Sequence, residues 1–447
     1  MEIRDVLHGS IKIEPHERPI LDSKYFQRLR QIKQLGFAEY SYPSATHNRY
    51  VHSLGAMQVA SRAYETLFEK SHYKLIDTSP ETYKKLKYVL RLAAMLHDIG
   101  HGPLSHTTEF AMPQVSKLDL PKNLFPSLTD RQATHEDYTL KIILDSDLTH
   151  LIELAGNSYG FKPEHIAALI DPSLPISEDF FTETIGGQKI NFRPVLQQLI
   201  SSELDADRMD YLQRDSFYGG VSYGQFDYDW LSNNLTTHFV ENQNQTYCHL
   251  AIEHRALYAF EDFLISRYHM FLMVYFHHKS GIYDAMLAQY FKSAPGEYIL
   301  PSSIDDYCNS NDAELYAALA QSKNEWAKRI SQKKPYQMLI ELHSGIPAGR
   351  AAQEQQEELL LKIKKDLDHQ NVHYLETKAT GELSKYFGKP GHTLYVRYNN
   401  LFSSPSFIAL EKCTDLFDRY REKRSITRLY VSPETLHRVK TQHLSLG

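Results

Sequence analysis

Four residues, His52, the adjacent pair His97-Asp98, and Asp207, have side chains of the kinds that bind metal ions. Imidazole and carboxylate ligands together suit Mn, Fe, Co, Ni or Zn, and Mg is less favoured by nitrogen ligands. A single His-Asp pair is weak evidence, because a capping Asp and a packed His explain it equally well. The expectation of a divalent metal site therefore depends on all four side chains meeting.

The stretch LAAMLHDIGHGPLSH is the most informative part of the chain. An apolar helix leads directly into His97-Asp98 and then breaks at Gly100. Adjacent helical residues point about 100° apart, so both side chains reach one ion most easily near a helix end. A helix that ends near Gly100 therefore allows His97 and Asp98 to bind the same metal ion.

Asp207 lies in the acidic stretch SSELDADRMDYLQRD, with Tyr211 and Asp215 at the i+4 and i+8 positions. This spacing places the three side chains on one face of a helix. Unpaired carboxylates on a buried helix would be costly, so a cation is a plausible partner for Asp207. His52 opens another expected helix.

The spacing of apolar residues predicts helices over 23–37, 52–70 and 84–100, and a mainly helical character for about the first 290 residues. Residues 112–130 and 172–193 are rich in loop-forming residues, and we expect both to be loops. FVENQNQTYCHLAIE alternates enough to predict a β-hairpin with its turn at 241–244. Strand-like pieces YQMLIEL, TLYVRY and RLYVS, with the helix EQQEELLLKIKKDL, follow in the tail.

The chain of 447 residues is too long for one ordinary compact domain. We expect a mainly α fold, with a helical core over 1–330 and a smaller C-terminal α+β lobe over 331–447. The three cysteines form no CxxC pair, which favours a reducing, cytoplasmic setting without disulfides. The net charge of -6 argues against bulk nucleic-acid binding, and no apolar run is long enough for a membrane span.

The order H…HD…D resembles the HD-domain phosphohydrolases, and further stretches make the likeness closer. DVLHGSIKI, FQRLRQIKQLG, THNRYVHSLG, LHDIGHGPLSH, THEDY and DADRMDYLQRD resemble the deoxynucleoside triphosphate (dNTP) triphosphohydrolases, which include bacterial dGTPase-like enzymes and an animal antiviral relative. The likeness covers roughly the first 300 residues in order. The joint occurrence of these motifs is specific, although an HD pair alone is not.

This resemblance implies an HD-domain helical core in which water attacks the α-phosphorus of a dNTP and releases a nucleoside and intact triphosphate. It implies metal ligands at His52, His97, Asp98 and Asp207 and catalytic histidines at His101, His106 and His135. Glu109 follows His106 by three residues, so its carboxylate can orient that imidazole. A hydrogen-bonded structural role is the alternative for each histidine.

Further positions match substrate contacts in the family. Cationic contacts to the phosphates are implied at Arg49, Arg208 and Arg267, and contacts to the sugar and base at Gln34, Leu35, Tyr211, Asp215 and Tyr275. Tyr275 is implied to pack near C2′, and Arg267, Phe271, Tyr275 and His278 are expected on one helical face. Phe276 replaces a Gln of a relative with broad substrate range, which leaves the preferred base open.

Asp22, Gln27, Arg30 and Arg255 match positions that bind an activating nucleotide in regulated relatives. A helix face with surface ion pairs of little energetic weight is the alternative. Relatives assemble as oligomers, so the resemblance also implies a homo-oligomer, a dimer or a tetramer.

Two other functions remain open from the sequence. The first is a different HD-domain phosphohydrolase that acts on a nucleoside monophosphate, a cyclic dinucleotide or an alarmone. The second is a catalytically idle scaffold that senses nucleotides or binds nucleic acid. The set of three arginines favours the triphosphate, because a monophosphate needs fewer cations.

Overall fold

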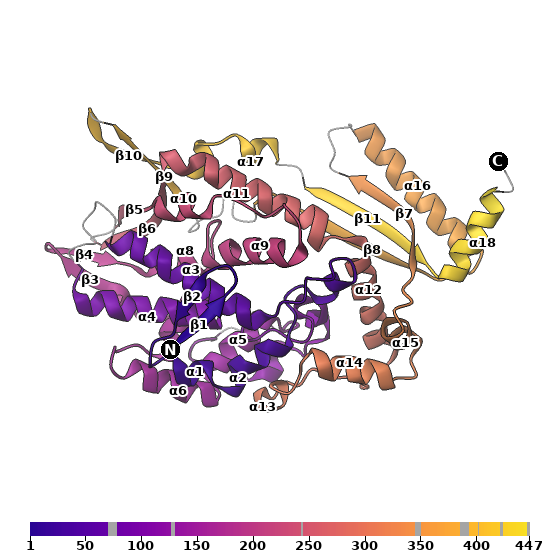
Figure 1. The fold of residues 1–447 in the computed structure, drawn as a ribbon, viewed down its shortest axis with the longest axis horizontal. Helices are drawn as coiled ribbons and strands as arrows, with labels where there is room; N and C mark the ends of the chain where they lie inside the picture. Colours follow the sequence, from indigo (N-terminus) through magenta and orange to yellow (C-terminus); the bar gives the residue numbers. More distant parts are fainter. Residues whose placement is uncertain are drawn as a thin grey trace.

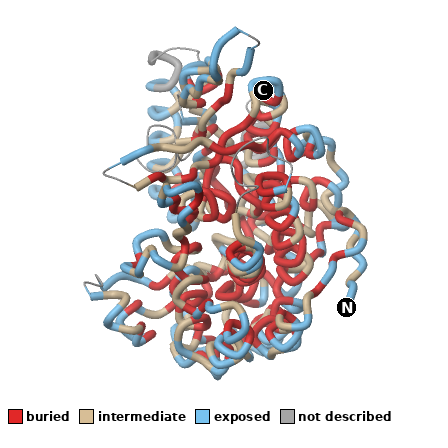
Figure 2. Tube along the Cα trace, turned by 90° about the vertical axis from the view of Figure 1, so that its left-hand side faces the viewer, coloured by how far each residue is buried: buried red, intermediate tan, exposed pale blue. Residues whose placement is uncertain are grey.

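The computed structural model describes residues 1–69, 78–126, 130–242, 245–344, 350–384, 393–400, 402–420 and 423–444. Figure 1 shows a large, mainly helical body and a smaller part of strands and helices that carries the C-terminus. Buried residues fill the interior of the body, as Figure 2 shows. The prediction of a mainly helical fold with a C-terminal α+β part is confirmed.

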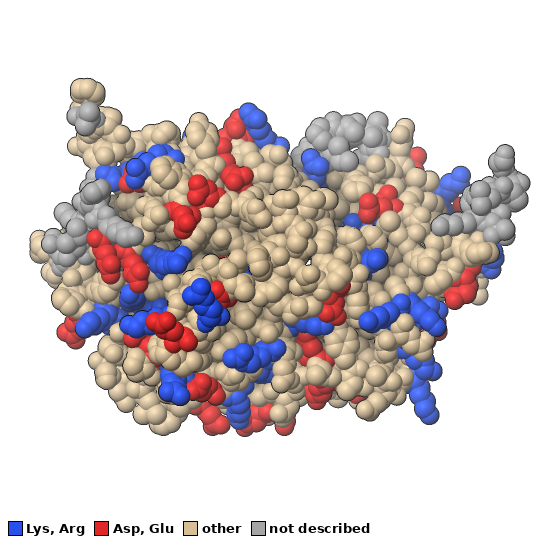
Figure 3. Space-filling view, viewed as in Figure 1, with Lys and Arg blue, Asp and Glu red and all other residues tan. Residues whose placement is uncertain are grey.

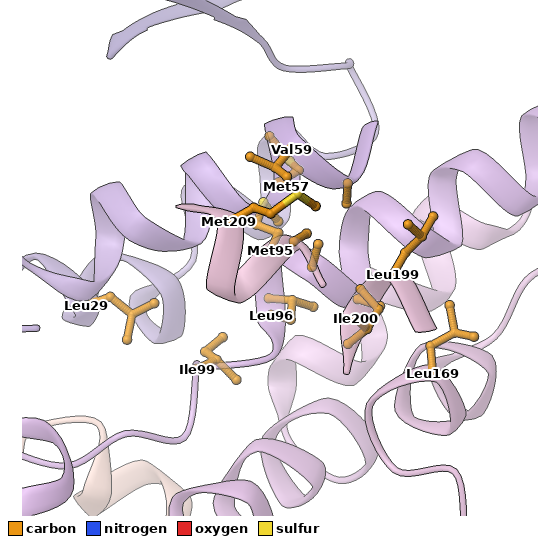
Figure 4. Close-up of a cluster of buried hydrophobic side chains, with 14 of the residues drawn as sticks. Leu29, Met57, Val59, Met95, Leu96, Ile99, Leu169, Leu199, Ile200 and Met209 are labelled. Atoms are coloured by element: carbon orange, nitrogen blue, oxygen red, sulfur yellow. The ribbon is translucent and has the colours of Figure 1, made fainter. Parts of the chain in front are cut away.

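Two long helices, α3 (Arg49–Glu69) and α4 (Pro80–Leu96), pack against each other at the centre of the body. Helix α9 (Ala206–Gly219) packs on α3, and α3 buries side chains around most of its circumference. Figure 4 shows Met57 of α3, Met95 of α4 and Met209 of α9 gathered in one part of this core. Around them lie α5 (His135–Leu144), α6 (Asp147–Gly156), α7 (Pro163–Ile170) and α8 (Arg193–Ile200).

The ends of α3 and α4 differ from the predicted ends, and the difference matters for the site. Helix α3 begins at Arg49 rather than at residue 52, and α4 ends at Leu96 rather than at residue 100. Ser79 caps α4 by accepting a hydrogen bond from the Thr82 N–H, and Pro80 is its first residue. Because α4 stops at Leu96, the next two side chains lie beyond the last turn.

The predicted helix over 23–37 is wrong, because this region is broken into short pieces. It contains α2 (Lys24–Gln27), a 3-10 turn over 28–31 and another over 36–40, after α1 (Arg18–Leu21). Ile32 is extended, and the Gln34 N–H bonds to the His47 carbonyl instead of to its own helix. Gly36 has a φ of +51°, which a side chain would strain, and a Cβ there would lie 2.8 Å from Thr107 Oγ1.

A six-stranded sheet packs beside the helical core, with β6 at its centre. The predicted hairpin is confirmed as β5 (Leu235–Asn242) and β6 (Gln245–Glu253), although 243–244 of its turn lie outside the described residues. The predicted loop over 172–193 is wrong for 182–191, which form the hairpin β3 (Thr182–Ile185) and β4 (Gln188–Asn191). Gly186 and Gly187 both have positive φ, as the two-residue turn between these strands requires.

The predicted exposed loop over 112–130 contains a 3-10 turn, Val115–Leu118, whose two end residues are buried. Residues 127–129 lie outside the described part. Beyond the sheet come α10 (Tyr228–Asn233), α11 (Leu257–Met270), a π-helical turn Phe271–Tyr275, α12 (His278–Ser293), α13 (Ile304–Tyr307), α14 (Asp312–Gln321) and α15 (Glu325–Ser331). The helix α12 packs against both the 36–40 turn and the turn over 105–111.

The C-terminal strands divide between two sheets. Strands β7 (Gln337–Ser344), β11 (Arg424–Val431) and β8 (Tyr374–Gly381) form a separate three-stranded sheet, with α16 (Arg350–His369) and α18 (Pro433–Leu444) beside it. Strands β9 (Tyr395–Asn400) and β10 (Ser403–Ala409) instead extend the sheet of the body, where β9 pairs with β6, and α17 (Leu416–Arg419) follows them. No described helix combines the length and the apolar composition that a membrane span needs.

Candidate metal centre and active site

The side chains of His52, His97, Asp98 and Asp207 meet at one point of the helical core. They come from α3, from the two residues after α4, and from the first turn of α9. One donor atom of each lies within 4.8 Å of the others. The His52 Nε2 atom is 3.0 Å from Asp207 Oδ1 and 3.4 Å from Asp98 Oδ2, and His97 Nε2 is 3.4 Å from Asp207 Oδ1.

Both histidines direct a free ring nitrogen into this cluster. The His97 Nδ1–H donates to the Ala94 carbonyl at 2.8 Å, and His52 Nδ1 lies 2.8 Å from Asp210 Oδ2. Because Nδ1 carries the proton in each ring, the lone pair is left on Nε2. The two Nε2 atoms are buried and make no well-aligned hydrogen bond with the protein. A metal ion would supply the partner that such nitrogens lack.

The electrostatics of the cluster also suit a positive charge. Burial lowers the pKa of His52, but hydrogen bonds with Asp207, Asp210 and Asp98 outweigh burial and raise it well above its usual value. Burial raises the pKa of Asp207, and hydrogen bonds from His52 and His97 bring it below its ordinary value. The negative charge that favours a proton on His52 would equally favour a divalent metal ion such as Mn, Fe, Co, Ni or Zn in its place.

A second cluster lies beside the first and contains the three predicted catalytic histidines. One donor atom each of His101, His106, Glu109 and His135 lies within 4.8 Å of the others. Glu109 Oε1 bonds to His106 Nδ1 at 3.1 Å and also to His135 Nδ1. The ring of His101 stacks on that of His135 with centroids 3.8 Å apart.

Glu109 is ionised in this cluster. Burial raises its pKa, but hydrogen bonds from His106 and His135 outweigh burial and lower the pKa far below its ordinary value. A carboxylate that accepts from Nδ1 fixes the tautomer and leaves Nε2 of the same ring for chemistry. His101 differs, because burial, Arg49 and His135 together lower its pKa well below the usual value. The predicted contact of Glu109 with His106 is thus present, and the same carboxylate oxygen also contacts His135.

The three predicted phosphate-contacting arginines are buried and held by carboxylates. Arg49 Nη1 lies 2.5 Å from Asp98 Oδ2, and Arg49 Nε donates to Ser105 Oγ at 2.8 Å. Glu203 Oε1 lies 3.4 Å from Arg208 Nη1 and 3.1 Å from Arg267 Nη2. Arg267 is therefore not a surface residue, and Glu203 was not anticipated from the sequence.

A group of polar side chains forms another wall of the site. The Tyr275 hydroxyl donates to Asp215 Oδ2 at 2.7 Å, and His47 Nε2 lies 2.8 Å from Asp215 Oδ1. Gln34 Oε1 is buried without a hydrogen-bond partner, and the rings of Tyr211 and Tyr275 meet edge to face. The π-helical turn of Phe271–Tyr275 precedes α12, so His278 does not share the face of Arg267, Phe271 and Tyr275 as predicted.

These groups surround one cavity of about 640 Å³, a volume typical of small-molecule sites. Metal-site residues His97, Asp98 and Asp207 reach its wall, as do His101, His106 and His135. All the residues predicted to contact substrate line it, namely Gln34, Leu35, Arg49, Arg208, Tyr211, Asp215, Arg267 and Tyr275. Phe276 is not one of the described residues that line the cavity. Asp284 does line it.

Of the four residues predicted to bind an activating nucleotide, Gln27 and Arg30 are hydrogen-bonded to each other, whereas Asp22 and Arg255 contact residues outside the set. Asp22 pairs with Arg18, Gln27 bonds to Arg30, and the Arg30 guanidinium lies over the Tyr50 ring. Arg255 instead bonds to Asn234 and lies over Trp230. Nucleotide activation and assembly into a homo-oligomer stay predictions. On the face in Figure 3, acidic and basic side chains lie interspersed.

Sequence reasoning missed Asp210, which lies on α9 beneath the metal cluster and is fully buried. It contacts His52, His8 and Arg214. Two signals were present: Asp210 lies in the motif DADRMDYLQRD, and its spacing of four residues from Arg214 indicates an ion pair on a helix. His8 and His47 lie in the stretches DVLHGSIKI and THNRYVHSLG, but the sequence did not assign them a role because their partners are distant in sequence.

Comparison with known proteins agrees with this geometry. The HD domain model matches residues 49–215, which run from the start of α3 to Asp215, and the HD associated region matches 236–359. The chain is 30% identical over 340 residues to an uncharacterized protein, MJ1154, of Methanocaldococcus jannaschii, covering 76% of this chain and 59% of that one. It is 27% identical over 330 residues to bovine deoxynucleoside triphosphate triphosphohydrolase SAMHD1, covering 68% and 51%.

The chain thus spans about half to three fifths of the length of these curated relatives. The crystal structure of a hypothetical protein from Aquifex aeolicus superposes with a TM-score of 0.70 at 26% identity, over 99% of both chains. The HD model begins at α3 and ends in α9, and so contains all four residues of the metal cluster. The chain is therefore an HD-domain protein, with an HD-associated region that follows the HD domain in the sequence.

Proposed function

We propose that this protein is a metal-dependent phosphohydrolase that cleaves dNTPs to a deoxynucleoside and inorganic triphosphate. One observation carries the proposal: the metal-ligand cluster, the His–Glu cluster and three buried arginines open into the same cavity. A phosphate ester needs a metal, a proton donor and cations at one place, and these three groups supply them. The similarity to bovine deoxynucleoside triphosphate triphosphohydrolase SAMHD1 supports the choice of substrate.

His52, His97, Asp98 and Asp207 would hold the metal. A divalent metal bound there would polarise the α-phosphate and lower the pKa of a water molecule. Arg49 bonds to Asp98 and lies next to the cluster, where it can also approach the substrate. Its guanidinium offers further donors for phosphate oxygens, since Arg can bond to two acceptors at once.

His106 is the proton donor in this proposal. Its Nδ1 bonds to Glu109, so Nε2 is the ring atom that can protonate the departing 5′-oxygen. Attack by the water oxygen on the α-phosphorus breaks the bond to the 5′-oxygen, which leaves as the hydroxyl of the deoxynucleoside. The proton lost by the water restores the imidazolium, directly or through solvent, because the His106 side chain is 65% exposed. The released triphosphate keeps the water oxygen.

Arg208 and Arg267 would neutralise the remaining phosphates, with Glu203 holding both guanidinium groups in position. Tyr275 would face the sugar, where its ring leaves no room for a 2′-hydroxyl, and Gln34 has an unpaired oxygen that suits a 3′-hydroxyl. The hydrogen bond from Tyr275 to Asp215 fixes the ring in this place. In this proposal, the shape of the Tyr275 ring and the hydrogen bond to Gln34 would select deoxyribose over ribose.

The test offers purified protein with Mn²⁺ each dNTP, each NTP and a dNMP, alone and in mixtures, with products separated by chromatography. Equimolar deoxynucleoside and triphosphate from dNTPs supports the proposal. Orthophosphate from a dNMP instead identifies another class of HD-domain phosphohydrolase. The absence of any product with Mn²⁺, Fe²⁺ or Zn²⁺ contradicts an enzymatic role.

A further inference from the structure

The N-terminal hairpin reaches the metal centre through a single buried carboxylate. The hairpin consists of β1 (Glu2–Asp5) and β2 (Gly9–Lys12), and His8 lies in its turn. One oxygen of Asp210 lies 2.6 Å from His8 Nε2, and the other lies 2.8 Å from Nδ1 of the metal-site residue His52. Two histidines that are 44 positions apart in the chain thus bind the two oxygens of one carboxylate.

Arg214 fixes this carboxylate from a third side. Its Nε and Nη2 atoms donate to the two oxygens of Asp210 at 2.8 Å and 2.9 Å, and its Nη1 donates to Asp5 Oδ2 at 2.9 Å. Arg214 and Asp210 are fully buried, so each charge depends on the other for compensation. The Arg214 guanidinium therefore joins the hairpin to α9 as well as orienting Asp210.

The turn of the hairpin is built to present His8. Asp5 Oδ1 accepts hydrogen bonds from the Leu7 and His8 N–H groups at 3.0 Å and 2.9 Å, and Gly9 has a φ of +71°. His8 is buried although Val6 in the same turn is exposed. A turn fixed by its own side chain and backbone positions the His8 ring with little conformational freedom.

Helix α3 makes room for the same contact. Gly55 follows His52 by three residues, so it lies on the same face of α3. A Cβ at Gly55 would lie 1.9 Å from Asp210 Oδ1 and 2.4 Å from Arg214 Nη2. The close approach of Asp210 and Arg214 to α3 therefore requires glycine at this position.

We propose that His8 is a positioning residue for the metal centre, which acts through Asp210 on the ring of His52. His8 and Arg214 Nη2 occupy Oδ1 of Asp210, and Arg214 Nε occupies one side of Oδ2. The remaining side of Oδ2 accepts from His52 Nδ1–H. This contact fixes the ring orientation and the tautomer that puts a lone pair on Nε2, and it increases the basicity of that nitrogen. Carboxylates behind metal-binding histidines change metal affinity by about 10- to 100-fold in other proteins.

The inference depends on the metal centre and not on the identity of the nucleotide. Three variants of the full chain test it: His8→Leu removes the donor, His8→Gln keeps an N–H donor near the position of Nε2, and Ser10→Ala is the matched control. Ser10 lies in the same hairpin and is exposed, and its hydroxyl donates a hydrogen bond to Glu2 at 2.6 Å, away from the metal centre. The readout is the Mn²⁺ dissociation constant, measured from the free Mn²⁺ signal in electron paramagnetic resonance, with thermal unfolding measured in parallel.

We expect His8→Leu to weaken Mn²⁺ binding by about tenfold, and His8→Gln and Ser10→Ala to stay within about threefold of the wild type. A lowered melting temperature of His8→Leu with unchanged Mn²⁺ affinity would show a purely structural role and overturn the inference. Equal losses in His8→Leu and His8→Gln would also overturn it. Failure of the wild type to bind Mn²⁺, Fe²⁺ or Zn²⁺ would overturn the metal centre itself, whereas tight binding without dNTP cleavage would leave this inference intact.

Discussion

Replacing Glu109 with Gln removes a charge from the centre of the His–Glu cluster while it keeps almost the same shape. One oxygen of Glu109 accepts from Nδ1 of both His106 and His135. Glutamine retains one acceptor oxygen, but it cannot stabilise a positive imidazolium as a carboxylate does. A hydrogen bond to a charged group is worth about 1.5–3 kcal/mol. Loss of one such bond in the transition state lowers kcat by about 10- to 150-fold.

The assay is the steady-state release of triphosphate from a dNTP, with bound metal measured in the same preparations. Metal content should not change, because Glu109 is not one of the four metal-site residues. Glu153→Gln is the matched control, since Glu153 also follows a histidine by three residues, but that pair is exposed on α6. A kcat of Glu109→Gln within twofold of the wild type would refute the proton-donor role. A parallel loss of metal would show that the two clusters are not separate.

Three further changes test other parts of the site. Gly55→Ala should destabilise the fold by about 2 kcal/mol or more, seen in the denaturant midpoint, because the new Cβ meets Asp210; an unchanged midpoint would contradict that close approach. Burial raises the pKa of Asp284 to about 7, so the folded state holds its proton more tightly than the unfolded chain, whose pKa is 3.8. The free energy of unfolding that this group contributes is complete below pH 3.8 and is lost as pH rises through 7, by up to about 4 kcal/mol and less where the cavity is hydrated. Asp284→Asn should remove this loss, and equal pH profiles of the two proteins would exclude it. Tyr275→Ala should raise kcat/KM for NTPs relative to dNTPs by about tenfold, whereas Tyr275→Phe keeps the ring and the ratio; an unchanged ratio in the alanine variant would remove the ring as the sugar filter.

The metal cluster was accessible from sequence because its members lie at points where local patterns are strong. An apolar helix that breaks at glycine marks His97-Asp98, and helical spacing groups Asp207, Tyr211 and Asp215. The structure places the last three along one wall of the cavity. Residues four apart on a helix share a face whatever their tertiary surroundings are, so this part of the site needs no long-range information.

The residues behind the cluster were not accessible in this way. Asp210 does not line the cavity, and its partner His8 lies in a hairpin about 200 residues earlier. The helix predicted over 23–37 failed for a related reason. Lys33 and Gln34 give their N–H groups to Asp312 and His47, contacts that no local periodicity reveals. The strands β3 and β4 carried a Gly-Gly turn, but they depend on β6 for the sheet that they join.

The destination of the water oxygen tests the central claim most directly. A dNTP is incubated with the protein and Mn²⁺ in ¹⁸O-labelled water, and the products are followed by ³¹P nuclear magnetic resonance. The proposal predicts triphosphate that carries one ¹⁸O atom on a terminal phosphorus, with an unlabelled deoxynucleoside. Orthophosphate or pyrophosphate as the labelled product, or ¹⁸O in the deoxynucleoside, would contradict attack at the α-phosphorus.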